Sequence, residues 1–134
     1  MATRNPYQAY QNNSIATASP GELTLMLYNG CLKFIHLAKK AIENKNFEEK
    51  NKNIQKAQNI IRELMMTLDT GKFEDAEKML SLYDFILREL IQANVKNDMS
   101  KLDTAEELVT GFRDTWKQVI QANRRQTYGQ GGKV

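Results

Sequence analysis

The length, composition and charge of the chain favour a single globular domain. Its 134 residues are 41% hydrophobic and 26% charged with a net charge of +3, which suits one core and excludes both a second full domain and wholesale disorder. Acidic and basic residues are mixed instead of forming a basic stripe, so we expect no nucleic-acid partner. A single cysteine excludes an internal disulfide. No apolar run approaches the roughly 20 residues that span a bilayer, and the polar N-terminal residues are unlike a signal peptide. We therefore expect a cytoplasmic protein without membrane insertion.

Residues 1–18 carry more apolar and aromatic groups than a polar tail needs. Tyr7 and Tyr10 are three positions apart, so they share a face if this stretch turns helical, and Ile15 follows them. We predict an N-terminal capping segment that docks on the rest of the chain. The segment either covers a binding groove as a removable cap or packs permanently and adds only stability.

Residues 19–123 contain four apolar stripes with steps of three and four residues, which predict four helices. Helices of about 20 residues joined by short connections run antiparallel, so we predict an all-α, up-down four-helix bundle. The polar, glycine-rich residues 124–134 predict a disordered C-terminal tail. The helix boundaries are marked by Ser19-Pro20-Gly21-Glu22, Asn44-Lys45-Asn46, Thr70-Gly71, Lys96-Asn97-Asp98 and a capping Ser100.

Three residues on the stripes are assigned mainly to packing. Cys31 is expected in the core as a small hydrophobe. Trp116 is expected there too, and its replacement by alanine would cost roughly 3 to 5 kcal/mol. Gly30, in the interior of a helix, indicates the close approach of a neighbouring helix or, alternatively, a shallow spot where a ligand segment crosses.

Catalytic chemistry has little support in the sequence. His36 is the only histidine, and Lys33 stands three positions before it, where the di-iron bundles have a glutamate. We therefore expect no enzyme activity and no catalytic, metal or cofactor site. His36 itself is expected on the surface or at the edge of a groove.

Apolar residues outside the stripes indicate a surface for a partner. The apolar residues of the third helix cover a wider arc than contact with one neighbouring helix needs. Two explanations are equally good: the helix contacts two neighbours in the bundle, or part of the arc forms a solvent-facing groove. The second helix adds Met65 and Met66, whose flexible side chains suit a variable partner, and a helix-forming segment in a hydrophobic groove is the binding mode that fits. Periodicity assigns to this groove six residues that are each also compatible with the core, namely Ile15, Leu27, Ile60, Leu82, Ile86 and Ile91.

Short blocks of sequence, in order and spacing, resemble the FliS family of flagellin-specific secretion chaperones. The resemblance covers nearly the whole chain up to about Asn123, and it rests on the blocks together because no single block is decisive. The blocks are Asn5-Pro6-Tyr7, Tyr10-Gln11, Thr17-Ala18-Ser19-Pro20, Leu25-Met26-Leu27-Tyr28-Asn29-Gly30, Lys56-Ala57-Gln58-Asn59-Ile60-Ile61, Glu63-Leu64, Leu82-Tyr83, Leu90-Ile91-Gln92-Ala93-Asn94, Asn97-Asp98 and Trp116-Lys117.

This resemblance implies a function and partners. A FliS-like protein would be a cytosolic export chaperone that binds the disordered C-terminal segment of flagellin, prevents premature polymerisation and keeps flagellin competent for secretion, without a nucleotide. The complex would pass to the flagellar export gate, and Tyr7 and Tyr10 would shift when flagellin binds. The groove also offers a route to a homodimer of the free protein. A regulatory adaptor that binds a folded protein is the alternative function.

Overall fold

The computed structural model describes residues 20–68, 71 and 74–131. The predicted N-terminal capping segment, with Tyr7, Tyr10 and Ile15, lies outside the described residues. The described part consists of four helices, α2 (Pro20–Glu43), α3 (Phe47–Thr67), α4 (Ala76–Lys96) and α5 (Met99–Gly131). The predicted all-α class is confirmed.

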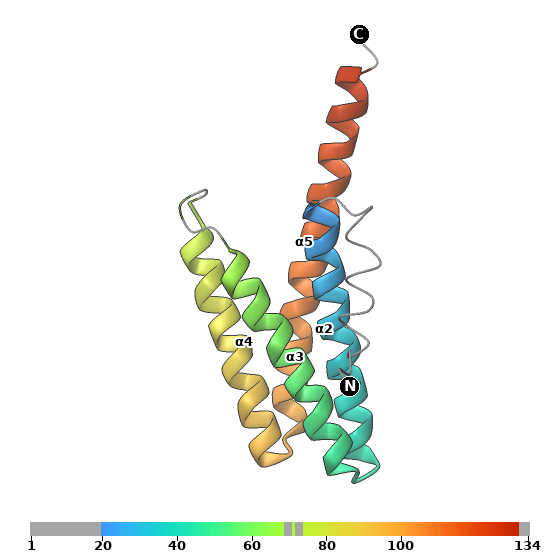
Figure 1. Cartoon of the computed structure of the whole chain (residues 1–134), viewed down its shortest axis with the longest axis vertical. Coiled ribbons are helices and arrows are strands. Elements are labelled where there is room, and N and C mark those ends of the chain that lie inside the picture. Colours follow the sequence, from blue (N-terminus) through green and yellow to red (C-terminus); the bar gives the residue numbers. More distant parts are fainter. Residues whose placement is uncertain (1–19, 69–70, 72–73, 132–134) are drawn as a thin grey trace, which may run out of the picture.

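The helices form an antiparallel bundle in which each helix contacts two neighbours. α2 and α4 each pack along both α3 and α5, while α2 and α4 themselves lie diagonally opposite and meet through the side chains of Tyr28 and Tyr83. Figure 1 shows that α2 and α5 lean away from α3 and α4 toward the end where α3 stops. We call this the open end, and we call the opposite end, with the turns at residues 44–46 and 97–98, the closed end.

Capping groups in the sequence account for the closed-end turns. The Asn46 side chain accepts a hydrogen bond from the Glu49 N–H at 3.2 Å and so caps α3 at the predicted boundary. α4 is capped at its C-terminal end by Asn97, whose left-handed backbone (φ 52°) allows its N–H to donate to the Ala93 carbonyl. The next cap differs from the prediction, because Asp98 Oδ1 accepts hydrogen bonds from the Ser100 N–H (2.9 Å) and hydroxyl (2.6 Å). These bonds, the hydroxyl's above all, lower the pKa of the Asp98 carboxyl.

The C-terminal part of α5 also differs from the prediction. Composition predicted a disordered tail over residues 124–134, but the backbone is helical to Gly131. Extending an existing helix requires no new nucleus, and residues 124–126, Arg-Arg-Gln, are good helix formers. The prediction considered only the composition of residues 124–134 and did not take into account that they continue an existing helix. Residues 132–134 lie outside the described part.

One apolar core runs along the bundle. Cys31 is 0% exposed, as predicted. The packing interpretation of Gly30 is also confirmed, because a Cβ atom on this residue would lie only 3.3 Å from Ile60 Cδ1 on the neighbouring helix. The other largest fully buried side chains are Tyr28, Ile35, Ile54, Ile61, Ile86, Leu90, Leu102 and Val109.

Candidate functional site

The open end contains a cavity whose wall includes residues from all four helices. Its volume is about 190 Å³, and cavities of about 150 Å³ already hold a benzene-sized group. The cavity is therefore large enough for one aliphatic or aromatic side chain. It is lined by Thr24 and Tyr28 from α2, Leu64, Thr67 and Leu68 from the end of α3, Met79 and Tyr83 from α4, and Trp116 from α5.

Two hydrogen-bonded tyrosines are part of the cavity wall. The Tyr28 and Tyr83 hydroxyls are 2.6 Å apart in a buried hydrogen bond. The Phe112 ring lies 5.9 Å from the ring of Tyr28 and 5.1 Å from that of Tyr83, measured between centroids. Burial raises the pKa of both phenols, so both carry their protons at neutral pH. One hydroxyl proton serves the mutual bond, and the other is available to an acceptor.

Trp116 closes the cavity from the side of α5. Its indole N–H donates to the Gly21 carbonyl at 2.8 Å and so ties α5 to the first turn of α2. Its side chain is only partly buried and packs at the margin of the core. The sequence prediction of a full core position was too strong, because the indole lines the open-end cavity and is only partly enclosed by other side chains.

Two apolar stripes on α4 are exposed on either side of the core. Leu82 and Phe85 are 41% and 40% exposed, and they share a helix face with Glu89, whose carboxylate pairs with Lys101 of α5 at 3.4 Å. We call these two residues the α5-facing stripe. Ile91 and Val95, 39% and 77% exposed, form the α3-facing stripe.

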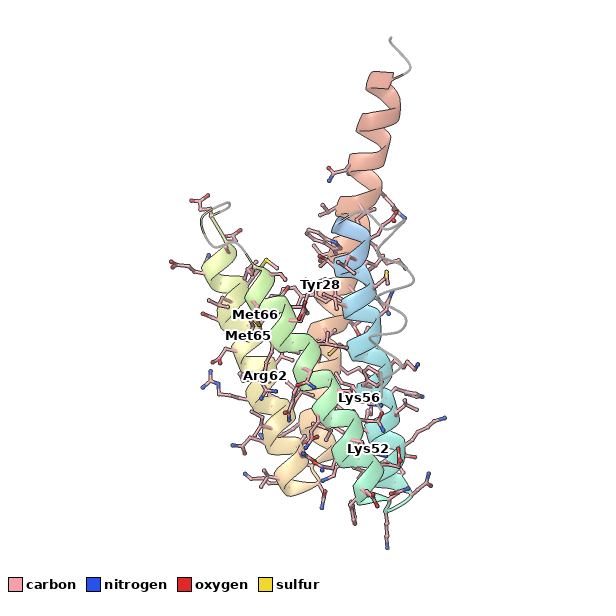
Figure 2. All side chains as sticks on the ribbon, viewed as in Figure 1. Tyr28, Lys52, Lys56, Arg62, Met65 and Met66 are labelled. Atoms are coloured by element: carbon pink, nitrogen blue, oxygen red, sulfur yellow. The ribbon has the colours of Figure 1, made fainter. Side chains whose placement is uncertain are left out.

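Contacts with α3 fix the direction of the second stripe. Asn94, three positions after Ile91 and so next to it on the helix surface, donates from Nδ2 to Asn51 Oδ1 of α3 at 2.7 Å. Further along α3, Figure 2 shows Met65 and Met66 next to each other toward the open end, and Met66 is 83% exposed. Apolar surface is thus present on α4 and on the neighbouring end of α3.

The structure divides the five predicted groove residues that it describes. Leu82 and Ile91 are exposed, as a partner surface requires. Leu27, Ile60 and Ile86 are instead core residues, with exposed fractions of 4%, 1% and 0%. Ile86 stands three positions after Tyr83 and four before Leu90, so it lies in the middle of the buried face, and Ile60 fills the space that Gly30 leaves open.

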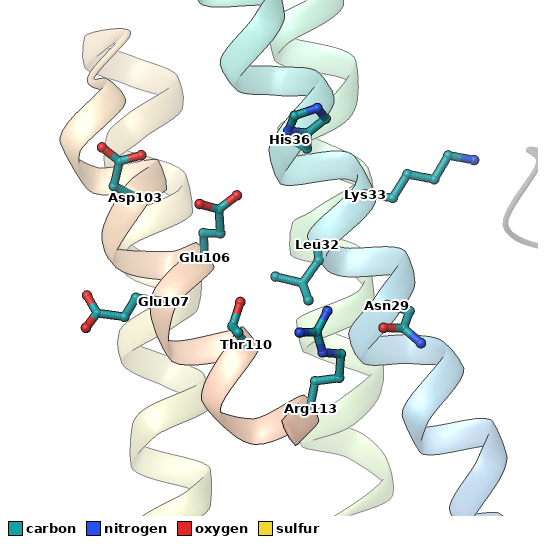
Figure 3. Close-up of a pocket in the computed structure, with 9 residues that line it drawn as sticks. All are labelled: Asn29, Leu32, Lys33, His36, Asp103, Glu106, Glu107, Thr110 and Arg113. Carbon is teal, nitrogen blue, oxygen red and sulfur yellow. The ribbon is translucent and has the colours of Figure 1, made fainter. Parts of the chain in front are cut away.

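A second, shallower groove lies between α2 and α5 (Figure 3), with a volume of about 510 Å³. Leu32 of α2 and Thr110 and Arg113 of α5 point into it, while His36 lies at its edge and is exposed, as predicted. Acidic side chains of α5 are paired here, because Lys39 Nζ lies 2.6 Å from Asp103 Oδ1 and 3.1 Å from Glu106 Oε1. This ion pairing, with the hydrogen bond to Asp103 first, raises the pKa of Lys39.

The described residues meet the requirements of neither a metal site nor a membrane-spanning helix. No group of histidine, cysteine and acidic side chains there is arranged to hold a metal ion. None of the four helices combines the length and apolar character needed to cross a bilayer.

The bundle is the fold of a known class of helical chaperone. A solved structure described as "Crystal structure of flagellar chaperone from bacteria" superposes with a TM-score of 0.72 over 87% of this chain and 95% of that chain, at 19% sequence identity. The family model described as "Flagellar protein FliS" matches residues 3–123. The chain belongs to the FliS family.

Two curated relatives are similar along most of their length. The Bacillus subtilis (strain 168) protein, named flagellar secretion chaperone FliS, is 58% identical over 132 residues, which is 98% of both chains. The Escherichia coli (strain K12) protein of the same name is 32% identical over 110 residues, or 81% of both chains. The resemblance inferred from the sequence blocks is confirmed.

Proposed function

We propose that this chain is a cytosolic flagellar export chaperone that binds the disordered C-terminal segment of flagellin, prevents its premature polymerisation and keeps it competent for secretion. Family membership supports a role in flagellar export. The observation that carries the flagellin proposal is the pair of exposed apolar stripes on α4, which lie on both flanks of a helix whose inner face is already buried.

The α4 stripes offer the contacts that an unfolded apolar segment needs. Ordering such a segment costs about 2–5 kcal/mol or more of the interaction energy. Full burial of one large apolar side chain contributes about 1.5–3 kcal/mol, so a few anchors against Leu82, Phe85, Ile91 and Val95 offset that cost. The open-end cavity accepts one further anchor. Because these contacts are separate, they are lost one at a time, and release needs no nucleotide.

The core residues Leu27, Ile60 and Ile86 act in this proposal from beneath the surface. They pack in the core that supports α4, the helix with the exposed stripes, and they do not themselves contact flagellin. The N-terminal residues Tyr7, Tyr10 and Ile15 act as a cap that shifts when flagellin binds. Tyr10→Ala is expected to weaken flagellin binding while the helical circular dichroism spectrum stays unchanged; unaltered affinity would remove Tyr10 from the proposal.

The test is calorimetric titration of the full chain with the C-terminal segment of flagellin at several temperatures. We expect one-to-one binding with a large negative heat-capacity change, the mark of apolar burial coupled to folding. The double variant Leu82→Ser/Ile91→Ser is expected to bind roughly tenfold more weakly or worse. Leu37→Ser on α2 is a matched control, because Leu37 is 38% exposed on the helix diagonally opposite α4.

Three outcomes of the titration overturn parts of the proposal. An absence of binding at micromolar concentration removes flagellin as the partner. Equal losses in Leu37→Ser and in the α4 variant remove the α4 stripes as the site. Binding of a folded flagellin domain but not of the segment favours a regulatory adaptor.

The handover to the flagellar export gate and the homodimer of the free protein belong to the same proposal. A homodimer through the α4 stripes would compete with flagellin, since both partners need the same apolar surface. Sedimentation of the free chain over a range of concentrations, repeated with Leu82→Ser/Ile91→Ser, measures this directly. A dimer that persists in the variant would place the dimer interface elsewhere.

A further inference from the structure

A groove between α2 and α3 differs in charge from the α2–α5 groove. It has a volume of about 380 Å³ and is lined by Lys33 and Lys40 from α2 and Lys56 from α3. Lys33 and Lys40 are seven positions apart, so they lie two turns apart on one helix face. Figure 2 shows Lys56 in the middle of α3 and Lys52 one turn nearer the closed end. We call this surface the basic groove.

The floor of the basic groove is aromatic and apolar. The Phe34 side chain is only 4% exposed, and two ammonium groups approach its ring, Lys56 Nζ at 5.3 Å and Lys33 Nζ at 5.8 Å from the centroid. The ring attracts each cation, but two like charges held beside one ring repel each other. Leu37, 38% exposed, continues this floor along α2.

The lysines of the basic groove lack the carboxylate partners that the α2–α5 groove provides. In the α2–α5 groove, one lysine, Lys39, is bound by two carboxylates. Among the residues that the structure describes, Lys33, Lys40 and Lys56 form no ion pair, and the one carboxylate of the basic groove, Glu49, faces Lys52 at 3.9 Å. Three ammonium groups around an apolar floor are therefore without a carboxylate in salt-bridge contact among the described residues, although Lys33 also borders the α2–α5 groove.

We propose that the basic groove binds an acidic amphipathic segment of a partner protein. Carboxylates one to two helical turns apart would pair with Lys33 and Lys40 on one wall and with Lys56 on the other, while an apolar side chain would cover Phe34 and Leu37. A nucleic acid fits less well, because Glu49 in the wall repels phosphates and no continuous basic track follows the groove. The basic groove lies away from α4, so this proposal does not rest on the flagellin proposal.

The test is the fluorescence anisotropy of a labelled synthetic helical peptide, with glutamates and leucines on one face, titrated with the full chain. We expect binding that weakens as salt rises from about 50 to about 200 mM, and no binding of the same peptide with lysines in place of the glutamates. The variant Lys40→Glu/Lys56→Glu is expected to bind roughly tenfold more weakly or worse. Thermal unfolding of the variant, followed by circular dichroism, checks that the bundle is intact.

The matched control is Lys78→Glu/Lys96→Glu, which makes the same change in net charge on α4, the helix diagonally opposite α2. We expect its affinity to stay within about twofold of the wild type. An equal loss of affinity in this control would mean that the overall charge of the chain, and not the basic groove, determines peptide binding, and it would overturn the proposal. Equally tight competition by a single-stranded oligonucleotide of the same charge would assign the groove to nucleic acid instead.

Discussion

The two ends of the bundle are held together by different means. At the closed end, Lys50 Nζ donates to the Asn94 carbonyl at 2.7 Å and the Asn94 side chain donates to Asn51, so a polar network joins α3 to α4 next to two short turns. At the open end, the contacts between the helix pairs are the Tyr28–Tyr83 bond and aromatic packing around a cavity. The bundle is thus joined by a polar network at one end and by aromatic contacts around a cavity for one side chain at the other.

The largest effect is expected in the closed half, at Ile54, which is 0% exposed in α3. Ile54→Ala should lower the free energy of unfolding by about 2–5 kcal/mol, because it removes buried methyl groups and leaves a cavity that the tightly held helices cannot close. Urea denaturation followed by circular dichroism measures the change. Ile54→Val is the control, at about 0.5–1.5 kcal/mol. A loss below about 1 kcal/mol in the alanine variant would mean that the closed half can relax around a gap.

A smaller effect is expected at the open end, although the side chain removed is larger. Trp116→Ala should cost about 1–3 kcal/mol, because the indole is only partly buried and its loss enlarges a cavity that already exists. Trp116→Phe separates the hydrogen bond to Gly21 from ring packing, and we expect it to cost about 1 kcal/mol. A cost equal to that of Ile54→Ala would contradict the difference between the two ends; an unchanged denaturation midpoint would show that Trp116 does not pack in solution.

The smallest expected effect is a pH dependence at the open end. Burial raises the pKa of Tyr83 above its ordinary value of 10.0, so the unfolded chain releases this proton first as the pH rises. The stability contributed by the buried phenol is complete below about pH 10 and is lost as the pH rises toward the folded-state pKa. The free energy of unfolding should therefore fall more steeply above about pH 10 in the wild type than in Tyr83→Phe, by at most about 1.4 kcal/mol per pH unit.

The pH comparison has an internal control, because both proteins keep the same cysteine and lysines and differ in one phenol. Urea titrations at about pH 8, 10 and 11 are sufficient to compare the slopes. Parallel slopes in the two proteins would show that Tyr83 ionises as freely in the folded chain as in the unfolded one.

The helices were predictable because their signals are local. Steps of three and four apolar residues lie within one stretch of chain, and the Asn46 cap acts on Glu49, three positions away. The start of α5 was placed less well, since both Asp98 and Ser100 are good capping residues and only the observed hydrogen bonds distinguish them. The helical backbone of the last part of α5 was not predicted, because the composition of that stretch carries no information about the helix that precedes it.

The surfaces were less predictable because they join distant parts of the chain. Leu82 and Ile86 both lie outside the predicted seam, and only the bundle reveals that Ile86 is buried and Leu82 is not. Tyr28 and Tyr83 are 55 positions apart, so no local sequence pattern predicts their hydrogen bond or the cavity beside it. Their one sequence signal is a phenol at a core position, which needs a polar partner when it is buried.

The buried Cys31 gives the protein a reporter of its own internal motion. Its thiol is fully covered, lies 3.9 Å from the Ala57 carbonyl of α3, and has a pKa raised by burial to about 12. Alkylating reagents attack the exposed thiolate, so they can modify this side chain only while α2 and α3 are apart. The rate of alkylation of the native chain therefore measures how often those two helices separate, and slower alkylation with a partner bound would show how far the stabilisation spreads from the surface into the core.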